Sequence, residues 1–146
     1  MVVPDKRIIN FLKKHHVLNL ATSVENKPWC CSCFYSFVED EMILILTSDD
    51  ETRHAREFLK NPNIAGSVHL ETWIIGKIKG IQFSGTIELA KGDKIDKARK
   101  SYLKRFPFAV LMDTTLWILK IDVIKMTDNK FGFGKKLIWE RNLNSF

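Results

Sequence analysis

The alternation of apolar and polar positions along the chain predicts a domain built mainly of β-strands. Short runs rich in β-branched and aromatic residues are separated by turn residues, which is the pattern of strands joined by tight connections. Short turns between the first three runs predict an antiparallel meander. The expected strands cover residues 17–24, 29–38, 42–47, 64–70, 74–89, 117–125 and 130–139.

Three further segments show the three-to-four residue spacing of amphipathic helices. The first covers residues 4–15, and the third begins at Gly92 and ends before Pro107. The second is expected to follow residues 48–51, whose S-x-x-E sequence has the form of a capping box, and to end before Asn61. Strands therefore dominate, and three short helices flank or plug them.

Glycines inside the expected strands indicate bends or close backbone contacts. Gly76, Gly80 and Gly85 fall in the 74–89 run, as suits a small closed barrel. Gly132 and Gly134 alternate with aromatic residues in the last expected strand. They either leave one face bare for a flat ring or relieve crowding in a tight barrel.

Length and composition are those of one globular domain covering residues 1–146. Hydrophobic residues make up 45% of the chain, yet no apolar run approaches the length that spans a bilayer. The N-terminal segment lacks the features of a signal peptide, so we expect a cytoplasmic protein with no membrane partner. The net charge of +6 is scattered rather than clustered, which favours a small anionic ligand and argues against nucleic acid.

A strand end followed by a helix start gathers groups that suit a phosphate. Thr47 closes the third strand, and Thr52, Arg53 and His54 lie in the first turn of the next helix, where backbone N–H groups are free. The acidic residues 49–51 in the same turn would repel an anion unless they face solvent. An ordinary capped surface helix is the alternative interpretation.

Cys30, Cys31 and Cys33 lie too close in sequence for good disulfide geometry, so reduced thiols are expected. Strand alternation places Cys31 and Cys33 on one face and Cys30 on the other. None of the four histidines has a recognisable metal-site spacing to them, and we expect packed thiols, or thiols that line a ligand, and no metal site. Hydrolase and nucleotide-binding motifs are absent from the sequence, so no catalytic residue is assigned and redox chemistry would need a cofactor.

The order of elements and the turn before the second helix resemble the pyridoxamine 5′-phosphate oxidase-like split barrels that bind FMN. Thr47, the run Thr52-Arg53-His54 and the later Asn61-Pro62 match that family's pattern, although His54 stands where the family has Lys. Within the superfamily, the chain resembles a bacterial YhbP-like branch of unassigned activity almost end to end. The matching runs are residues 52–55, 80–83, 98–100, 105–107, 127–129, 132–136 and 138–139.

This resemblance implies a split β-barrel of about six to seven antiparallel strands with three short helices. It also implies a homodimer with a flavin at each subunit interface. The phosphate would be held by Thr47, Thr52, Arg53 and His54. The ring would be contacted by Cys31, Ser32, Cys33 and Phe34, with Gln82 on a later strand. The oxidase's basic motif for its vitamin substrate has no recognisable counterpart here, so vitamin B6 synthesis is not expected.

Three hypotheses follow. The leading one is an FMN-dependent oxidoreductase, with a nicotinamide nucleotide as a candidate electron donor. The second is a non-enzymatic module that holds flavin, haem or another planar anion for sensing or storage. The third is a protein-interaction module whose ligand site has decayed.

Overall fold

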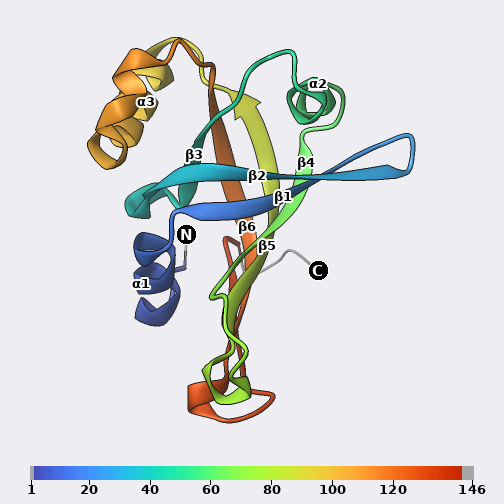
Figure 1. Cartoon of the computed structure of the whole chain (residues 1–146), viewed down its shortest axis with the longest axis vertical. Coiled ribbons are helices and arrows are strands. Elements are labelled where there is room, and N and C mark those ends of the chain that lie inside the picture. The colour runs from blue at the N-terminus through green and yellow to red at the C-terminus, as the bar shows by residue number, and fades with distance from the viewer. Residues whose placement is uncertain (1, 143–146) are drawn as a thin grey trace.

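The computed structural model describes residues 2–142, whose seven strands form one antiparallel sheet (Figure 1). The strand order is β3-β2-β1-β4-β5-β6-β7, and an additional pairing of β3 with β6 closes the sheet into a barrel. The long β6 pairs with β3 in its first part and with β7 in its second, so β7 extends beyond the barrel. The strands are β1 (Val17–Val24), β2 (Lys27–Val38), β3 (Ile43–Thr47), β4 (Asn63–His69), β5 (Lys79–Leu89), β6 (Leu116–Asp128) and β7 (Lys136–Glu140). The expected mainly β split barrel with three helices is confirmed.

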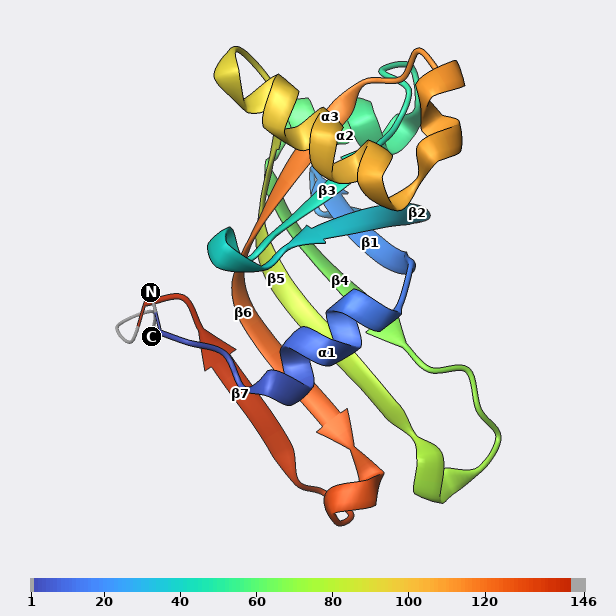
Figure 2. The same ribbon diagram turned by 90° about the vertical axis from the view of Figure 1, so that its left-hand side faces the viewer.

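Three α-helices accompany the sheet: α1 (Lys6–Lys14), α2 (Arg53–Lys60) and α3 (Asp93–Arg105). Figure 2 shows α1 lying across the sheet, with α2 and α3 both at the upper end, where Figure 1 shows them on opposite sides. Short 3₁₀ turns lie between these elements: η1 (Glu39–Glu41), η2 (Ile75–Lys77), η3 (Pro107–Leu111) and η4 (Asn129–Phe131). No helix among residues 2–142 is long and apolar enough to cross a membrane.

The core follows the alternation of the strands. Leu18 and Leu20 of β1 are buried and point into the barrel, whereas the intervening Asn19 faces outward and is partly exposed. The buried face of α1 seals the interior with Ile8, Ile9, Phe11 and Leu12. Burying each large aliphatic side chain of this kind stabilises a fold by about 1.5–3 kcal/mol, so the position of α1 is set by its apolar stripe.

The beginning of α2 differs from the expectation. Thr52, and not Ser48, is the N-cap, and its hydroxyl accepts a hydrogen bond from the backbone N–H of Ala55 at 3.3 Å. The chain first makes a turn in which the N–H of Thr52 donates to the carbonyl of Asp49 at 3.2 Å. The capping-box spacing was therefore misleading, because a tight turn occupies the residues that would have formed the first helical turn.

The last strand is shorter than the pattern predicts. β7 begins at Lys136, while Gly132 and Gly134 adopt φ values of 113° and 81° in the preceding turn. Glycine adopts such conformations without a steric cost, which explains both residues. A bare strand face for a flat ring, one of the two interpretations of these glycines, does not hold, and the prediction of a strand over residues 130–135 was wrong.

The prediction of a bend or close backbone contact at Gly85 is confirmed. A Cβ there would lie 2.0 Å from the carbonyl oxygen of Lys120 on β6, beside a bulge in the β5–β6 pairing at Ser84 and Gly85. Gly76, by contrast, has open space around it and lies in η2 rather than in a strand. Of these two positions, only position 85 requires glycine, because two backbones approach each other closely there.

Candidate functional site

One edge of β2 is unpaired where the candidate ring-contacting residues lie. β2 pairs with β1 over residues 27–34, but it pairs with β3 only from Tyr35 onward. The N–H of Tyr35 donates to the carbonyl of His16 on the β1 side at 3.0 Å. Because hydrogen-bonding directions alternate along an antiparallel strand, Cys31 and Cys33 also bond toward β1, and the backbone groups of Ser32 and Phe34 point the other way.

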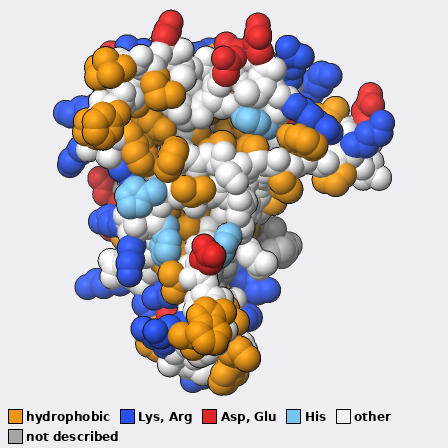
Figure 3. All heavy atoms as spheres, viewed as in Figure 1, with side chains coloured by type: hydrophobic (Ala, Val, Ile, Leu, Met, Phe, Trp, Pro, Cys, Tyr) orange, Lys and Arg blue, Asp and Glu red, His pale blue; other side chains and the backbone are white. Residues whose placement is uncertain are grey.

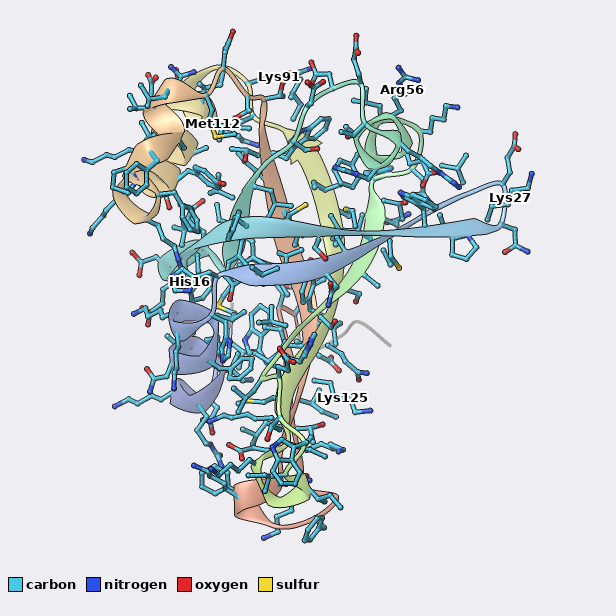
Figure 4. All side chains as sticks on the ribbon, viewed as in Figure 1. His16, Lys27, Arg56, Lys91, Met112 and Lys125 are labelled. Carbon is cyan, nitrogen blue, oxygen red and sulfur yellow. The ribbon has the colours of Figure 1, made fainter. Side chains whose placement is uncertain are left out.

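We call residues 31–33, on the side away from β1, the open edge of β2. In the part of the chain that the structure describes, no backbone group pairs with Ser32 on this side, whereas continuing the Tyr35–Leu46 register places Phe34 opposite Thr47, the last residue of β3. β3 would be the neighbour here, but it ends at Thr47 and the chain leaves the sheet toward α2. Figure 4 shows α2, marked by Arg56, above the β1–β2 hairpin whose tip is marked by Lys27. The β3–α2 connection therefore stands beside the open edge.

His54, in the first turn of α2, meets two of the thiols. The ligand atoms of Cys31, Cys33 and His54 all lie within 4.8 Å of one another, and the two Sγ atoms are 3.8 Å apart. Cys33 is buried, and Cys31 and His54 are partly buried. All three cysteines are free, and Cys30 is exposed on the opposite face of β2. Strand alternation thus brings together the two thiols that the sequence placed on one face.

Hydrogen bonds and burial set the protonation of this group. The thiol of Cys31 lowers the pKa of Cys33, and the same interaction with Cys33, together with burial, raises the pKa of Cys31. Burial also lowers the pKa of His54 and favours its neutral form. The Nε2 atom of His54 lies 2.5 Å from the hydroxyl of Ser48, which in turn lies 3.2 Å from the hydroxyl of Thr52.

Arg53, beside His54 in the first turn of α2, is engaged by other side chains. Its Nε donates to the carboxylate of Glu57 at 2.8 Å, and its guanidinium lies over the ring of Trp29 at 4.1 Å. Glu57 also accepts a hydrogen bond from Thr22, and these two interactions, that of Thr22 first, lower the pKa of Glu57. Part of the charge that would hold a phosphate is therefore already paired with a carboxylate. The acidic residues 49–51 are exposed to solvent, which removes one objection to an anion at this helix start.

Thr47 lies at a different cavity. Its hydroxyl donates to the hydroxyl of Tyr102 at 3.1 Å. Thr47 also lines a cavity of about 300 Å³ with Arg99, Tyr102 and the end of η3, residues 109–111. Sequence reasoning did not single out Arg99 or Tyr102 as site residues. Arg99 falls in one of the runs that carried the family resemblance, which was the available signal.

Gln82 is exposed on the outer face of β5 and lies in line with Ser32. Strand pairing joins Ser32 to Asn19, Asn19 to Ser67 and Ser67 to Gln82, and the hydroxyl of Ser32 donates to Asn19 at 2.9 Å. Three strand spacings separate Ser32 from Gln82, or about 14 Å. Gln82 therefore shares a face with Ser32 and Phe34 without lying next to the thiol cluster.

In the structure, the nine candidate residues thus fall into three groups. Cys31, Cys33 and His54 converge, with Thr52 joined to His54 through Ser48. Ser32, Phe34 and Gln82 are exposed on the outer face. Arg53 and Thr47 are each engaged by other side chains.

Solved structures with this fold include proteins that carry planar cofactors. A heme binding protein from Mycobacterium smegmatis superposes with a TM-score of 0.76 at 19% identity, covering 96% of this chain; this chain covers only 60% of that one. HutZ, the heme storage protein from Vibrio cholerae, gives 0.67 at 17% identity, over 84% of this chain and 92% of its own. An FAD-binding protein from Mesorhizobium loti gives 0.66 at 13% identity, over 82% and 90%. These likenesses establish the split-barrel fold.

Sequence comparison identifies the family of the chain, whereas the structural likenesses establish only its fold. No protein-family model matches the chain. A UPF0306 protein of Yersinia pseudotuberculosis is 46% identical over 138 residues, which cover 94% of each protein, and one of Yersinia pestis has the same identity and coverage. Identity at this level over nearly the full length shows that this chain belongs to the UPF0306 family.

Proposed function

We propose that this protein binds a flavin, FMN in the first instance, at the open edge of β2, and that it acts as a flavin-dependent oxidoreductase. The observation that carries the proposal is the unpaired backbone at Ser32 beside the β3–α2 connection. The ring system of a flavin has an imide edge with both donors and acceptors, and such an edge matches a strand that lacks a neighbour. An uncovered strand edge is otherwise a liability that proteins cover or protect.

The phosphate of FMN would lie at the start of α2, as the resemblance to the pyridoxamine 5′-phosphate oxidase-like proteins and their YhbP-like branch implies. Thr52, Arg53 and His54 supply hydroxyl, guanidinium and free backbone N–H groups there. The terminal nitrogens of Arg53 would contact the phosphate while Glu57 fixes the Nε. A nicotinamide nucleotide is the proposed electron donor.

The site of one copy is open, and a second copy is the proposed cover. Large apolar side chains are exposed at both ends of the molecule, over η3 beside α3 and over η2 and η4 (Figure 3). Isolated exposed apolar residues are ordinary, whereas gathered ones mark interaction surfaces. At the upper end they are Phe108, Val110, Leu111 and Met112, and at the lower end Trp73, Ile75, Phe131 and Phe133.

The proposal is tested by adding FMN to the purified protein, removing the unbound part and recording the visible spectrum. We expect about one flavin per chain, as for a pre-formed site, and bleaching of the bound flavin by NADH or NADPH. The variant Ser32→Pro removes the N–H that points from the open edge, and proline is tolerated at an unpaired strand edge. Loss of one such hydrogen bond should weaken FMN binding about tenfold.

Ser32→Ala is the matched control, because it removes the side chain but keeps the N–H. Equal FMN affinity for Ser32→Pro and Ser32→Ala, with both folded by circular dichroism, would show that the ring does not use the open edge. Arg53→Gln, compared with Arg56→Gln on the exposed side of the same helix, tests the phosphate contact separately.

A second function, a non-enzymatic holder of haem, is favoured by one specific observation. Arg53 is already paired with Glu57, and His54 replaces the lysine of the related flavoproteins, so the positive charge available to a phosphate is reduced. Retention of haem but not FMN after the same treatment would support this alternative.

A further inference from the structure

We propose that Cys31, Cys33 and His54 form a zinc-binding site with three protein ligands and one position left for water or another ligand. The three residues are not neighbours in the sequence, because the two cysteines lie on β2 and the histidine lies on α2, and β3 comes between these elements along the chain. Of the residues that the structure describes, these form the group of three histidine, cysteine or acidic side chains with ligand atoms close enough to share an ion.

The spacing of the sulfurs fits tetrahedral coordination. Two zinc–sulfur bonds of about 2.3 Å at the tetrahedral angle place the sulfur atoms about 3.8 Å apart. The Sγ atoms of Cys31 and Cys33 are 3.8 Å apart. The imidazole of His54 lies within 4.8 Å of both, so a small rotation of its side chain would complete three bonds.

The surroundings hold these ligands in place. Pairing with β1 fixes Cys31 opposite Leu20 and Cys33 opposite Leu18. The hydroxyl of Ser48 contacts Nε2 of His54 at 2.5 Å, the kind of outer contact that orients a metal-binding imidazole while its other nitrogen remains available. The site is shielded by burial of Cys33, but the partial exposure of Cys31 and His54 leaves a path for an ion.

The donor set selects the class of metal. Thiolate sulfur and imidazole nitrogen favour zinc over magnesium or calcium, which prefer oxygen ligands. Two thiolates carry the charge that a divalent ion neutralises. Two cysteines and one histidine with an open fourth position are one of the ligand sets used where zinc contacts a substrate or water rather than only stabilising a fold.

A disulfide between Cys31 and Cys33 fits the geometry poorly. A disulfide needs sulfurs about 2.05 Å apart and a Cβ arrangement that residues two apart on one strand face do not provide. The flavin ring and the metal would use different groups, because the open edge offers the backbone of Ser32, whereas the metal would use side chains on the inner face of β2. The two proposals share His54, which would offer its backbone N–H to the phosphate and its imidazole to the metal.

The test uses Co²⁺ as an optical probe for the full-length, reduced, flavin-free protein. We expect one equivalent of Co²⁺ to produce the thiolate-to-metal absorption and visible bands of a tetrahedral site, and Zn²⁺ to remove them by competition. Cys31→Ser, Cys33→Ser and His54→Gln should each abolish these bands or weaken metal binding at least tenfold.

Cys30→Ser and His69→Gln are the matched controls, since both residues are exposed and lie outside the cluster. Bound Zn²⁺ should also protect Cys31 and Cys33, but not Cys30, from alkylation mapped by mass spectrometry. Absence of the bands in a folded protein would overturn the proposal, as would equal loss in Cys30→Ser or alkylation of all three thiols in the presence of Zn²⁺.

Discussion

At the scale of single residues, the buried carboxylate of Glu57 links β1 to α2. It accepts hydrogen bonds from Thr22 and Arg53, which hold its pKa below the ordinary value of 4.5. Replacing Thr22 by Val should lower the melting temperature at neutral pH, because a buried acceptor loses its partner. Thr22→Ser keeps the hydroxyl and should behave nearly as the natural protein.

The same change should depend on pH. A carboxyl group whose pKa is depressed in the folded state stabilises the protein above its unfolded pKa, and this contribution is lost as the pH falls through the lower folded value. The difference in melting temperature between Thr22→Val and the natural protein should therefore shrink below about pH 4.5. A difference that stays constant down to pH 2 would mean that the Thr22–Glu57 bond does not stabilise the fold.

Single residues also show how far the sequence could predict the site. Alternation along a strand is a local property, and it was enough to place Cys31 and Cys33 on one face. The partner His54 and the carboxylate that engages Arg53 depend on how α2 packs, which no spacing along the chain reveals. Tyr102 at Thr47 was missed for the same reason.

At the scale of elements, the β5–β6 pair depends on Gly85. The variant Gly85→Ala would force a Cβ to within 2.0 Å of the carbonyl oxygen of Lys120, which belongs to the backbone and cannot rotate away. We expect a loss of about 1–3 kcal/mol in the free energy of unfolding, as for other overpacked positions. Urea denaturation measures it.

Gly76→Ala is the control, since nothing lies within 4 Å of a Cβ at that position. It should leave the midpoint of the urea transition almost unchanged. If the two variants have the same midpoint, the close contact between the backbones of β5 and β6 is absent in solution.

Elements with a strong hydrophobic period were predicted well, and those decided by turns were not. The strand at residues 17–24 has the predicted bounds, because its alternation is unbroken. The turn at Asp49 moved the start of α2, and positive φ angles at Gly132 and Gly134 shortened the last strand. Turn geometry depends on a few residues whose alternatives differ little in energy, so a spacing rule cannot decide between them.

At the scale of the whole molecule, we predict a homodimer. Leu111 and Phe108 are 87% and 85% exposed beside the cavity that Thr47 lines, and a partner covering η3 would also close that cavity. Light scattering should give twice the chain mass of 17.0 kDa. The variant Leu111→Glu should reduce the measured mass to that of one chain, whereas Trp73→Glu at the opposite end should leave it unchanged.

A mass of one chain for the natural protein at micromolar concentration would contradict this prediction. A dimer that survives Leu111→Glu but dissociates in Trp73→Glu would place the partner at the lower end instead, away from the cavity at Thr47.

The closure of the barrel has a consequence for how the chain reaches its native state. β3 and β6 meet with Leu44 opposite Leu119, although β4, β5 and α3 lie between them in the chain. Contacts between such distant segments carry a large loop-closure entropy, and proteins rich in them fold slowly, in milliseconds to seconds. We therefore expect the β1–β2–β3 meander and the β4–β5–β6 strands to assemble before they join. Until β3 docks on β6, both strands present unpaired edges to other chains, and this interval is when aggregation competes with folding.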